Sequence, residues 1–170
     1  AITASGGTAA NYDVTLAGNT LTVDKAALTV TADAARKTYG DADPALTYTV
    51  DPTQLKYTDS AAVVRDVQLA TATGAAATAG SHAIIATGGT ADNYTISTTG
   101  NILTVDKAAL TVTADPQRKT YGAADPTLTY SVDPTQLRYT DTLGVVSGVG
   151  LSTATGAAAT AGTHTIAITG

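Results

Sequence analysis

Two stretches of the chain carry almost the same letters. Residues 25–59 read KAALTVTADAARKTYGDADPALTYTVDPTQLKYTD, and residues 107–141 read KAALTVTADPQRKTYGAADPTLTYSVDPTQLRYTD. The two stretches start 82 positions apart, and the same offset aligns residues 1–88 with 83–170 at roughly seven identities in ten. Near-identical tandem copies are typical of arrays and stalks, whereas an enzyme rarely needs two copies of one site.

Apolar and polar residues alternate within each repeat, and this period of two predicts β-strands. Turn signals such as Gly88-Gly89 and Gly100-Asn101 separate the runs, so we expect about six short strands per repeat and no helix beyond about two turns. At least half of the residues from Ala27 to Val105 should lie in strands. The predicted fold is all-β, in tandem immunoglobulin-like antiparallel β-sandwiches. The residues expected to face inward are Leu28, Val30, Ala32, Leu46, Tyr48, Val50, Val67, Leu69, Ile84, Ala86, Tyr94, Ile96, Leu103 and Val105.

The boundary between repeats follows from the phase of this alternation. Leu103 and Val105 are odd-numbered whereas Leu110 and Val112 are even-numbered, so one strand cannot bury both pairs on one face. We therefore expect the chain to open and to end inside a repeat. The expected segments are 1–24 as the C-terminal strands of a preceding repeat, 25–106 as a complete β-sandwich repeat, and 107–170 as a second repeat lacking its last strands.

The joint between the repeats is short. Only residues 106–109 separate inward Val105 from inward Leu110, and none of them is Gly or Pro. A flexible tether would be longer and richer in Gly or Ser. We therefore expect neighbouring repeats to touch end to end, with turns such as Gly40 to Asp43 against the neighbour. We also expect residues 1–24 to complete the second repeat of another chain by strand donation.

Composition excludes several classes of function. The chain has no Cys, Met, Trp or Phe, and its 14 acidic residues are all aspartates. Its net charge is −5, so it offers no basic face for the phosphates of nucleic acid. It has no run of about 18 apolar residues and no basic N-terminal stretch before an apolar core, so we expect neither membrane insertion nor an export signal in this segment.

Three motifs follow one another in the repeat. They are A-L-T-V-T-A, then K-T-Y-G-x-x-D-P-x-L-T-Y-x-V, and finally N-Y-x-I with L-T-V-D. The most specific part is Lys37 to Gly40 with Asp43-Pro44, which returns at Lys119 to Gly122 with Asp125-Pro126. In these motifs the chain resembles the YGX-type MBG repeats of large bacterial adhesins and other surface proteins. The resemblance implies tandem β-sandwich modules in an extracellular stalk, and it implies no ligand and no catalytic residue.

The histidines do not predict an enzyme. His82 and His164 stand beside Ser81 and Thr163, but adjacent strand residues point to opposite faces, so a nucleophile and its base cannot meet there. We expect both histidines on the inward side, at strand ends. No other constellation suggests catalysis or a cofactor.

The aspartates permit a calcium site, because hard carboxylate oxygens are ligands for Ca²⁺. The candidates are Asp41, Asp43 and Asp106. Asp41 becomes Ala123 in the second copy, and no D-x-D-x-D-G loop is present, so turn-forming and capping roles are favoured. Lys25 and Lys37 are predicted to lie in solvent rather than in an intramolecular isopeptide bond.

The tyrosines recur at fixed places in both copies. Tyr48 and Tyr94 are expected to take the place of Phe and Trp in the core, with their hydroxyls at its rim. Tyr57 and Tyr139, beside the polar D-P-T-Q-L loop, are the candidates for ligand contact, and polysaccharide is the ligand that exposed tyrosine rings would suit.

The sequence thus leads to two hypotheses of function. The first is a structural stalk or spacer of an extracellular bacterial adhesin, which projects a binding tip from the cell surface and has neighbouring repeats as its partners. The alternative is a self-assembling, filament- or matrix-forming module, or a polysaccharide-binding surface module. Both place the chain in cell adhesion and biofilm at the bacterial surface.

Overall fold

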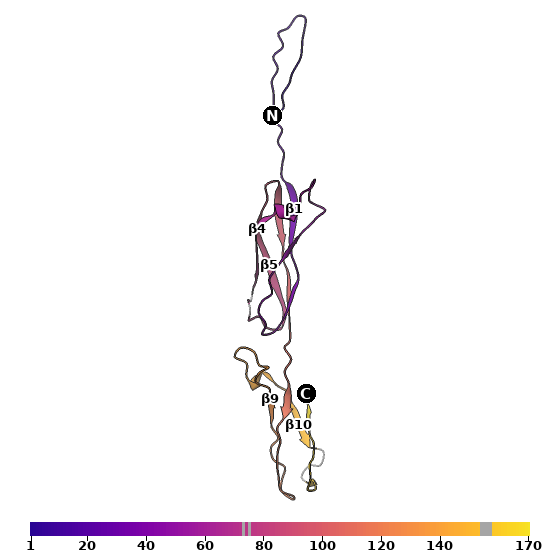
Figure 1. Ribbon diagram of the computed structural model, residues 1–170, viewed down its shortest axis with the longest axis vertical. Helices are drawn as coiled ribbons and strands as arrows, with labels where there is room; N and C mark the ends of the chain where they lie inside the picture. Colours follow the sequence, from indigo (N-terminus) through magenta and orange to yellow (C-terminus); the bar gives the residue numbers. More distant parts are fainter. Residues whose placement is uncertain (73, 75, 154–157) are drawn as a thin grey trace. The chain divides into compact units, whose positions relative to one another are not determined.

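The computed structural model describes residues 1–72, 74, 76–153 and 158–170 (Figure 1). More than half of the residues from Ala27 to Val105 lie in strands, as predicted, and the helices among the described residues are two short 3₁₀ turns, Ala61–Val63 and Leu143–Val145. The strands are β1 (Ala26–Ala32), β2 (Ala35–Thr38), β3 (Tyr48–Val50), β4 (Arg65–Thr71), β5 (Gly80–Thr90), β6 (Tyr94–Thr99), β7 (Asn101–Asp106), β8 (Val112–Ala114), β9 (Tyr130–Val132), β10 (Gly150–Thr153) and β11 (Ile166–Thr169).

The described residues form two compact units. Both units draw on the first repeat, and the second also contains the whole second repeat. The first unit consists of residues 1–33, 46–70 and 84–101, and the second unit consists of residues 34–45, 71–83 and 102–170.

Two packed sheets build the first repeat. One has the order β3-β1-β6, in which β1 runs antiparallel to β3 and parallel to β6. The other has the order β2-β7-β5-β4, in which β2 runs parallel to β7. Ala26 faces Tyr94 in the first parallel pair and Ala35 faces Leu103 in the second, so both pairs keep the same offset between residues.

The parallel pairs refine the predicted antiparallel architecture. The β1/β3, β8/β9 and β10/β11 pairs are antiparallel as expected. Parallel partners need a long connection between them, and the rest of the repeat supplies one between β1 and β6. Residues 26–38 contribute β1 to one sheet and β2 to the other, and residues 94–106 contribute β6 and β7 in the same way. The alternation of apolar and polar residues along a single strand does not reveal this change of sheet.

The strands differ from the prediction at two places. Among its described residues the first repeat has seven strands, because the unpredicted β2 carries a buried Lys37, whose charge hides the alternation. The expected turn at Gly88-Gly89 lies inside β5. Gly88 has φ +74°, and a Cβ there would stand 2.6 Å from the carbonyl oxygen of Asp66, so the pair forms a glycine-dependent irregularity within the strand rather than a reversal of the chain.

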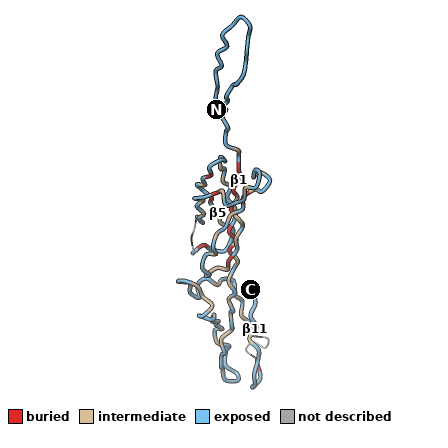
Figure 2. The backbone as a smooth tube through the Cα atoms, turned by 45° about the horizontal axis from the view of Figure 1, so that its top comes forward, coloured by how far each residue is buried: buried red, intermediate tan, exposed pale blue. Residues whose placement is uncertain are grey.

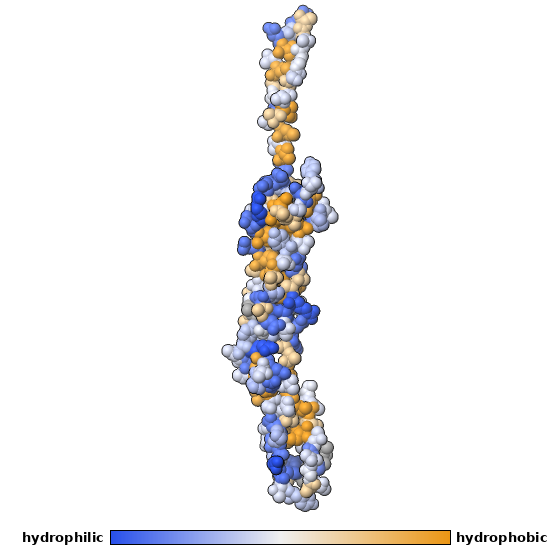
Figure 3. All heavy atoms as spheres, viewed as in Figure 1, coloured by the Kyte–Doolittle hydropathy of each residue, from blue (hydrophilic) through white to orange (hydrophobic). Residues whose placement is uncertain are grey.

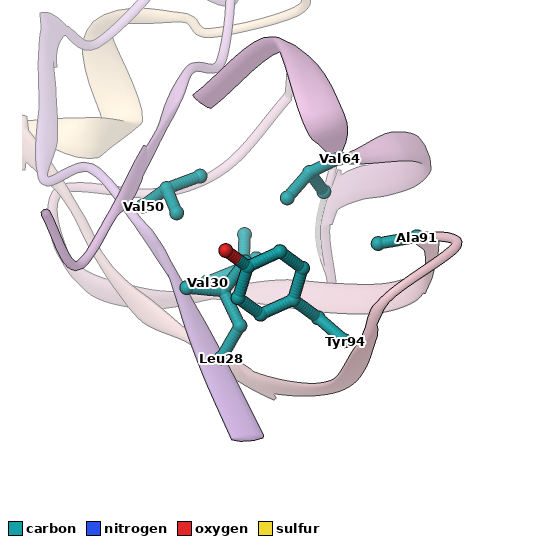
Figure 4. Close-up of a cluster of buried hydrophobic side chains, with 6 residues drawn as sticks. All are labelled: Leu28, Val30, Val50, Val64, Ala91 and Tyr94. Atoms are coloured by element: carbon teal, nitrogen blue, oxygen red, sulfur yellow. The ribbon is translucent and has the colours of Figure 1, made fainter. Parts of the chain in front are cut away.

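The core of the first unit confirms the predicted inward face. Leu28 and Val30 are fully buried and pack with Val50, Val64 and Ala91 around the ring of Tyr94 (Figure 4). Aliphatic side chains and one tyrosine thus build this core in a chain that has no Phe or Trp.

The second repeat buries less. Leu110 and Val112, the counterparts of Leu28 and Val30, are only half-buried. In the first repeat, β6 pairs with β1 from Ala26 to Thr31.

Residues 1–24 are exposed along their length (Figure 2). In the described part of the chain, the strand-like pairing of this segment is confined to Ile2 and Asn19, which exchange two backbone hydrogen bonds of 2.6 and 3.0 Å. Apolar side chains such as Val14 and Leu21 are exposed there, and Figure 3 shows apolar surface along this segment. The segment thus leaves apolar surface uncovered.

The two repeats provide a matched pair of core substitutions. We expect Leu28→Ala to lower the free energy of unfolding of its repeat by about 3 kcal/mol, because a buried leucine leaves a cavity. Leu110→Ala should cost about 1 kcal/mol or less, since that side chain is already half in water. Urea unfolding followed by NMR signals from each repeat measures both values. Equal costs would contradict the difference in packing.

Candidate inter-repeat contact site

A lysine closes the K-T-Y-G-x-x-D loop. The Lys37 Nζ donates to Asp43 Oδ1 at 2.7 Å and to the Asp41 carbonyl oxygen at 3.3 Å, and its side chain is only 3% exposed. The prediction that Lys37 lies in solvent is therefore wrong. The carboxylate partner compensates the charge and makes burial of the ammonium tolerable. Lys119 binds Asp125 in the second repeat, so the motif encodes the same clamp twice.

The D-P-T-Q turn fixes a second loop. Asp51 Oδ1 accepts hydrogen bonds from the backbone N–H and the hydroxyl of Thr53, at 2.9 and 2.7 Å, and these bonds hold the pKa of Asp51 below its ordinary value. Gln54 Oε1 accepts the N–H of Thr29 in β1 at 2.6 Å, which ties the turn to the sheet. The second repeat makes the same contacts with Asp133, Thr135, Gln136 and Thr111.

The loop that follows holds a tyrosine in a left-handed backbone conformation. Tyr57 has φ 55° and Tyr139 has φ 52°, a region that costs bulky residues free energy and is retained where the surroundings impose it. In both loops a backbone hydrogen bond of 3.0 Å closes the turn around this tyrosine, from the N–H of Asp59 to the Lys56 carbonyl oxygen and from that of Asp141 to the Arg138 carbonyl oxygen. In the first repeat the hydroxyl of the core residue Tyr94 also donates to Asp59 Oδ2 at 2.7 Å and accepts the N–H of Lys56 at 2.8 Å. The hydrogen bond to Asp59, followed by burial, raises the pKa of Tyr94.

The clamped loop of the first repeat meets the tyrosine loop of the second repeat inside the second unit. The rings of Tyr39 and Tyr139 lie edge to face, with centroids 5.7 Å apart at 70°. Burial, with a hydrogen bond and charge from Asp141, raises the pKa of the Tyr39 hydroxyl. Tyr39 is not among the predicted site residues; the signal that points to it is the recurrence of K-T-Y-G.

Gly40 allows the side chain of Arg138 to approach the backbone of the turn closely. A Cβ at this position would overlap with Arg138 Cδ, and the φ of +93° at Gly40 also favours glycine. The side chain of Arg138 thus lies directly on the backbone of the turn. At this residue the turn of the first repeat lies against a side chain of the second repeat.

The tyrosines that the sequence singled out have different surroundings. Tyr139 is in the ring contact and is 56% exposed, whereas Tyr57, at the same place in the first repeat, is fully exposed. Tyr48 is half-buried and Tyr94 is buried with its hydroxyl bonded at the core rim, as predicted.

The calcium candidates lie apart from any cluster of metal ligands. Asp41 sits in the turn, where its N–H donates to the Thr38 carbonyl oxygen. Asp43 binds Lys37, and Asp106 accepts two hydrogen bonds from the guanidinium of Arg36. Among the described residues, no three His, Cys, Asp or Glu side chains gather as a metal site would require.

Both histidines bind the backbone. The Nε2 of His82 donates to the Thr78 carbonyl oxygen at 2.6 Å, and that of His164 donates to the Thr160 carbonyl oxygen at 2.7 Å. His82 is half-buried on the Ile84 side of β5, as predicted, while His164 is exposed, contrary to prediction, because it precedes β11.

The D-P-T-Q turn predicts a pH effect. We expect Thr53→Ala to raise the pKa of Asp51 towards the ordinary value, because the hydroxyl donor is lost, and to leave the pKa of Asp133 unchanged as an internal control. The stabilisation from the ionised turn is present above an ordinary pKa of about 3.9 and is lost as pH falls through the lowered one. NMR titration of the aspartate carbons measures both groups, and an unchanged Asp51 would exclude the hydroxyl as the cause.

No described helix is long and apolar enough to span a membrane.

Comparison with known proteins assigns the chain to a protein family. No curated protein and no solved structure matches the chain. The family model described as MBG domain (YGX type) matches residues 28–104 and again residues 110–170, which together are most of the chain. The chain therefore belongs to the family of MBG domains of the YGX type, of which it carries two tandem copies.

Proposed function

We propose that the chain is a structural spacer in the stalk of an extracellular bacterial adhesin, where its repeats hold a binding tip away from the cell surface. Family membership supports a repeat module of surface proteins. The spacer role adds that length and stiffness are the function. The observation that carries it is the contact of Tyr39 and Gly40 with Tyr139 and Arg138 across a joint of four residues.

This contact supports stiffness because it attaches the two repeats to each other at a second point, in addition to the covalent link. The covalent link, residues 106–109, holds two repeats at one point, and the ring pair holds them at a second. Two points of attachment restrict bending more than one does. Since the joint is copied letter for letter at residues 24–27, each junction of an array should adopt the same angle.

Contact between neighbouring repeats should also add stability, because the core of each repeat is small. A domain of this size buries only about two-thirds of the surface of its unfolded chain, so stability is marginal without neighbours. Repeat proteins draw part of their stability from interfaces between adjacent units.

Small-angle scattering tests the spacer on chains of two, four and six complete repeats with the sequence of residues 25–106. Strands of about seven residues at roughly 3.3 Å each, with tilt and turns, predict an advance on the order of 35–45 Å per repeat. We expect the maximum dimension to grow in proportion to the number of repeats. Growth close to the square root of that number would mean flexible linkage and would exclude a stiff stalk.

Residues 1–24 favour self-assembly by strand donation as a second function. Their exposed apolar residues correspond at the repeat period to buried core residues: Leu21 to Leu103, Val23 to Val105 and Tyr12 to Tyr94. A Cβ on Gly18 would stand 2.7 Å from the Ile2 carbonyl oxygen, and a Cβ on the corresponding Gly100 would overlap with the Ile84 carbonyl oxygen. The segment thus keeps the close approach of β5 to the end of β6.

Hydrogen exchange tests strand donation. As chain concentration rises, we expect the amides of β8 to become protected, because residues 1–24 of another chain would cover its open flank. Leu21→Asp should abolish this protection by placing a charge in the core. Thr20→Asp is the matched control, since the corresponding Ile102 is half exposed. Protection that survives Leu21→Asp would rule out donation by this segment.

A further inference from the structure

The contact between Tyr39 and Tyr139 places two phenols side by side within one chain. Their rings lie edge to face with centroids 5.7 Å apart, so the edge of one ring stands against the other ring. Tyr139 is 56% exposed and Tyr39 is half-buried, so a small molecule in solution can reach the pair. The two residues are 100 positions apart and belong to different repeats.

Both rings are held by loops that are closed independently of the contact. The Lys37–Asp43 ion pair closes the loop that carries Tyr39. The hydrogen bond of 3.0 Å from the N–H of Asp141 to the Arg138 carbonyl oxygen closes the loop that carries Tyr139. Because the rings are already together, a reaction between them needs no encounter in solution and only a rotation of the exposed Tyr139 ring.

A carboxylate stands beside one of the two phenols. Burial, together with the charge and a hydrogen bond of Asp141, raises the pKa of the Tyr39 hydroxyl. Tyr39 therefore keeps its proton at neutral pH, and removal of an electron from its ring must be accompanied by removal of that proton. The Asp141 carboxylate is placed to accept it.

The composition of the chain leaves tyrosine as its means of forming an oxidative cross-link. Proteins of oxidising compartments commonly join distant segments by disulfides, and this chain has no cysteine. It has no methionine or tryptophan either, so these residues do not compete for an oxidant. Among the described residues, Tyr39 and Tyr139 are the two tyrosines whose rings are brought together.

We propose that Tyr39 and Tyr139 form an oxidative cross-linking site, at which a one-electron oxidant driven by peroxide joins the two rings through their ortho carbons. Each phenol gives up one electron and its hydroxyl proton. The two radicals pair their electrons in the new carbon–carbon bond, and the hydrogens of the bonded carbons move to the phenol oxygens. The pair thus loses two electrons and two protons in total, which reduce one molecule of hydrogen peroxide to two molecules of water.

The bond makes the contact between the two repeats covalent. Residues 106–109 already link the repeats along the backbone, and the new bond links them a second time through side chains. A contact of two loops that otherwise opens and closes then stays closed. The inference rests on the geometry of the ring pair and requires neither the spacer role nor strand donation.

Peptide mapping after oxidation tests the proposal on the intact chain. A small haem peptide with hydrogen peroxide serves as the oxidant, and its coupling of free tyrosine confirms that it is active. Trypsin releases residues 38–56, which contain Tyr39, and residues 139–170, in which Tyr139 is the single tyrosine. We expect these two peptides to be joined, with a mass lower by two hydrogens and with dityrosine fluorescence.

Concentration separates links within a chain from links between chains. A ring held within the same chain has an effective concentration of millimolar order, so at roughly 10 µM chain its link should exceed links between molecules by about 100-fold. The same oxidation in urea is the control for folding. There we expect the preference for residues 38–56 with 139–170 to be lost, because the loops no longer hold the rings together.

Phenylalanine variants separate the phenol from the ring. Tyr39→Phe and Tyr139→Phe keep an aromatic ring in the contact but cannot form the phenoxyl radical, so each should lower the yield of the link within the chain by about tenfold or more. Tyr39→Phe also distinguishes Tyr39 from Tyr48, which lies in the same tryptic peptide. Tyr57→Phe is the matched control, since Tyr57 has the same place and a similar φ in the first repeat, and it should leave the yield unchanged.

Three results would overturn the proposal. The first is the absence of the link under conditions in which free tyrosine couples. The second is an unchanged yield in Tyr39→Phe, which would assign the link to another tyrosine. The third is coupling of Tyr57 and Tyr121 as readily as of Tyr139, which would mean that exposure rather than the contact directs the reaction. A flexible array in the scattering experiment would change none of these measurements, so failure of the spacer role and failure of this inference can be told apart.

Discussion

The structure depends on the burial of β1 between its two neighbours. Leu28 and Val30 are fully covered because β6 runs beside β1 along its length and brings the ring of Tyr94 over them. In the second repeat the corresponding residues, Leu110 and Val112, are half-buried. The core consists of aliphatic residues and one tyrosine, so the fold buries little apolar area. Covering this flank of β1 therefore contributes more to stability than any single side chain.

Tyr94 connects the core to the loop that carries Tyr57. Its ring lies among the aliphatic residues, and its hydroxyl binds both Lys56 and Asp59 on either side of Tyr57. A hydroxyl at the core rim is thereby bonded to both sides of an exposed tyrosine. The core of the first repeat and this loop thus belong to one hydrogen-bonded network.

The repeated motifs are loop-building devices rather than catalytic ones. K-T-Y-G-x-x-D uses a buried lysine and an aspartate to close a turn, and D-P-T-Q uses an aspartate and a glutamine to tie the next turn to β1. Their products are two preformed loops, one ending in Tyr39-Gly40 and the other in Arg138-Tyr139, which fit each other. Preformed loops suit an array, since each junction forms with little loss of conformational entropy.

The sequence by itself determined the repeat period, the all-β class and the inward faces, because alternation and near-identity are local properties of the letters. It also singled out Tyr57 and Tyr139, since both stand beside polar turn residues. Only the tertiary structure decided that β1 and β2 run parallel to β6 and β7, that Lys37 is buried against Asp43, and that Tyr39 meets Tyr139. Those features join residues distant in the chain or hide a charge inside a strand. Their free energy comes from contacts that no window of neighbouring residues contains.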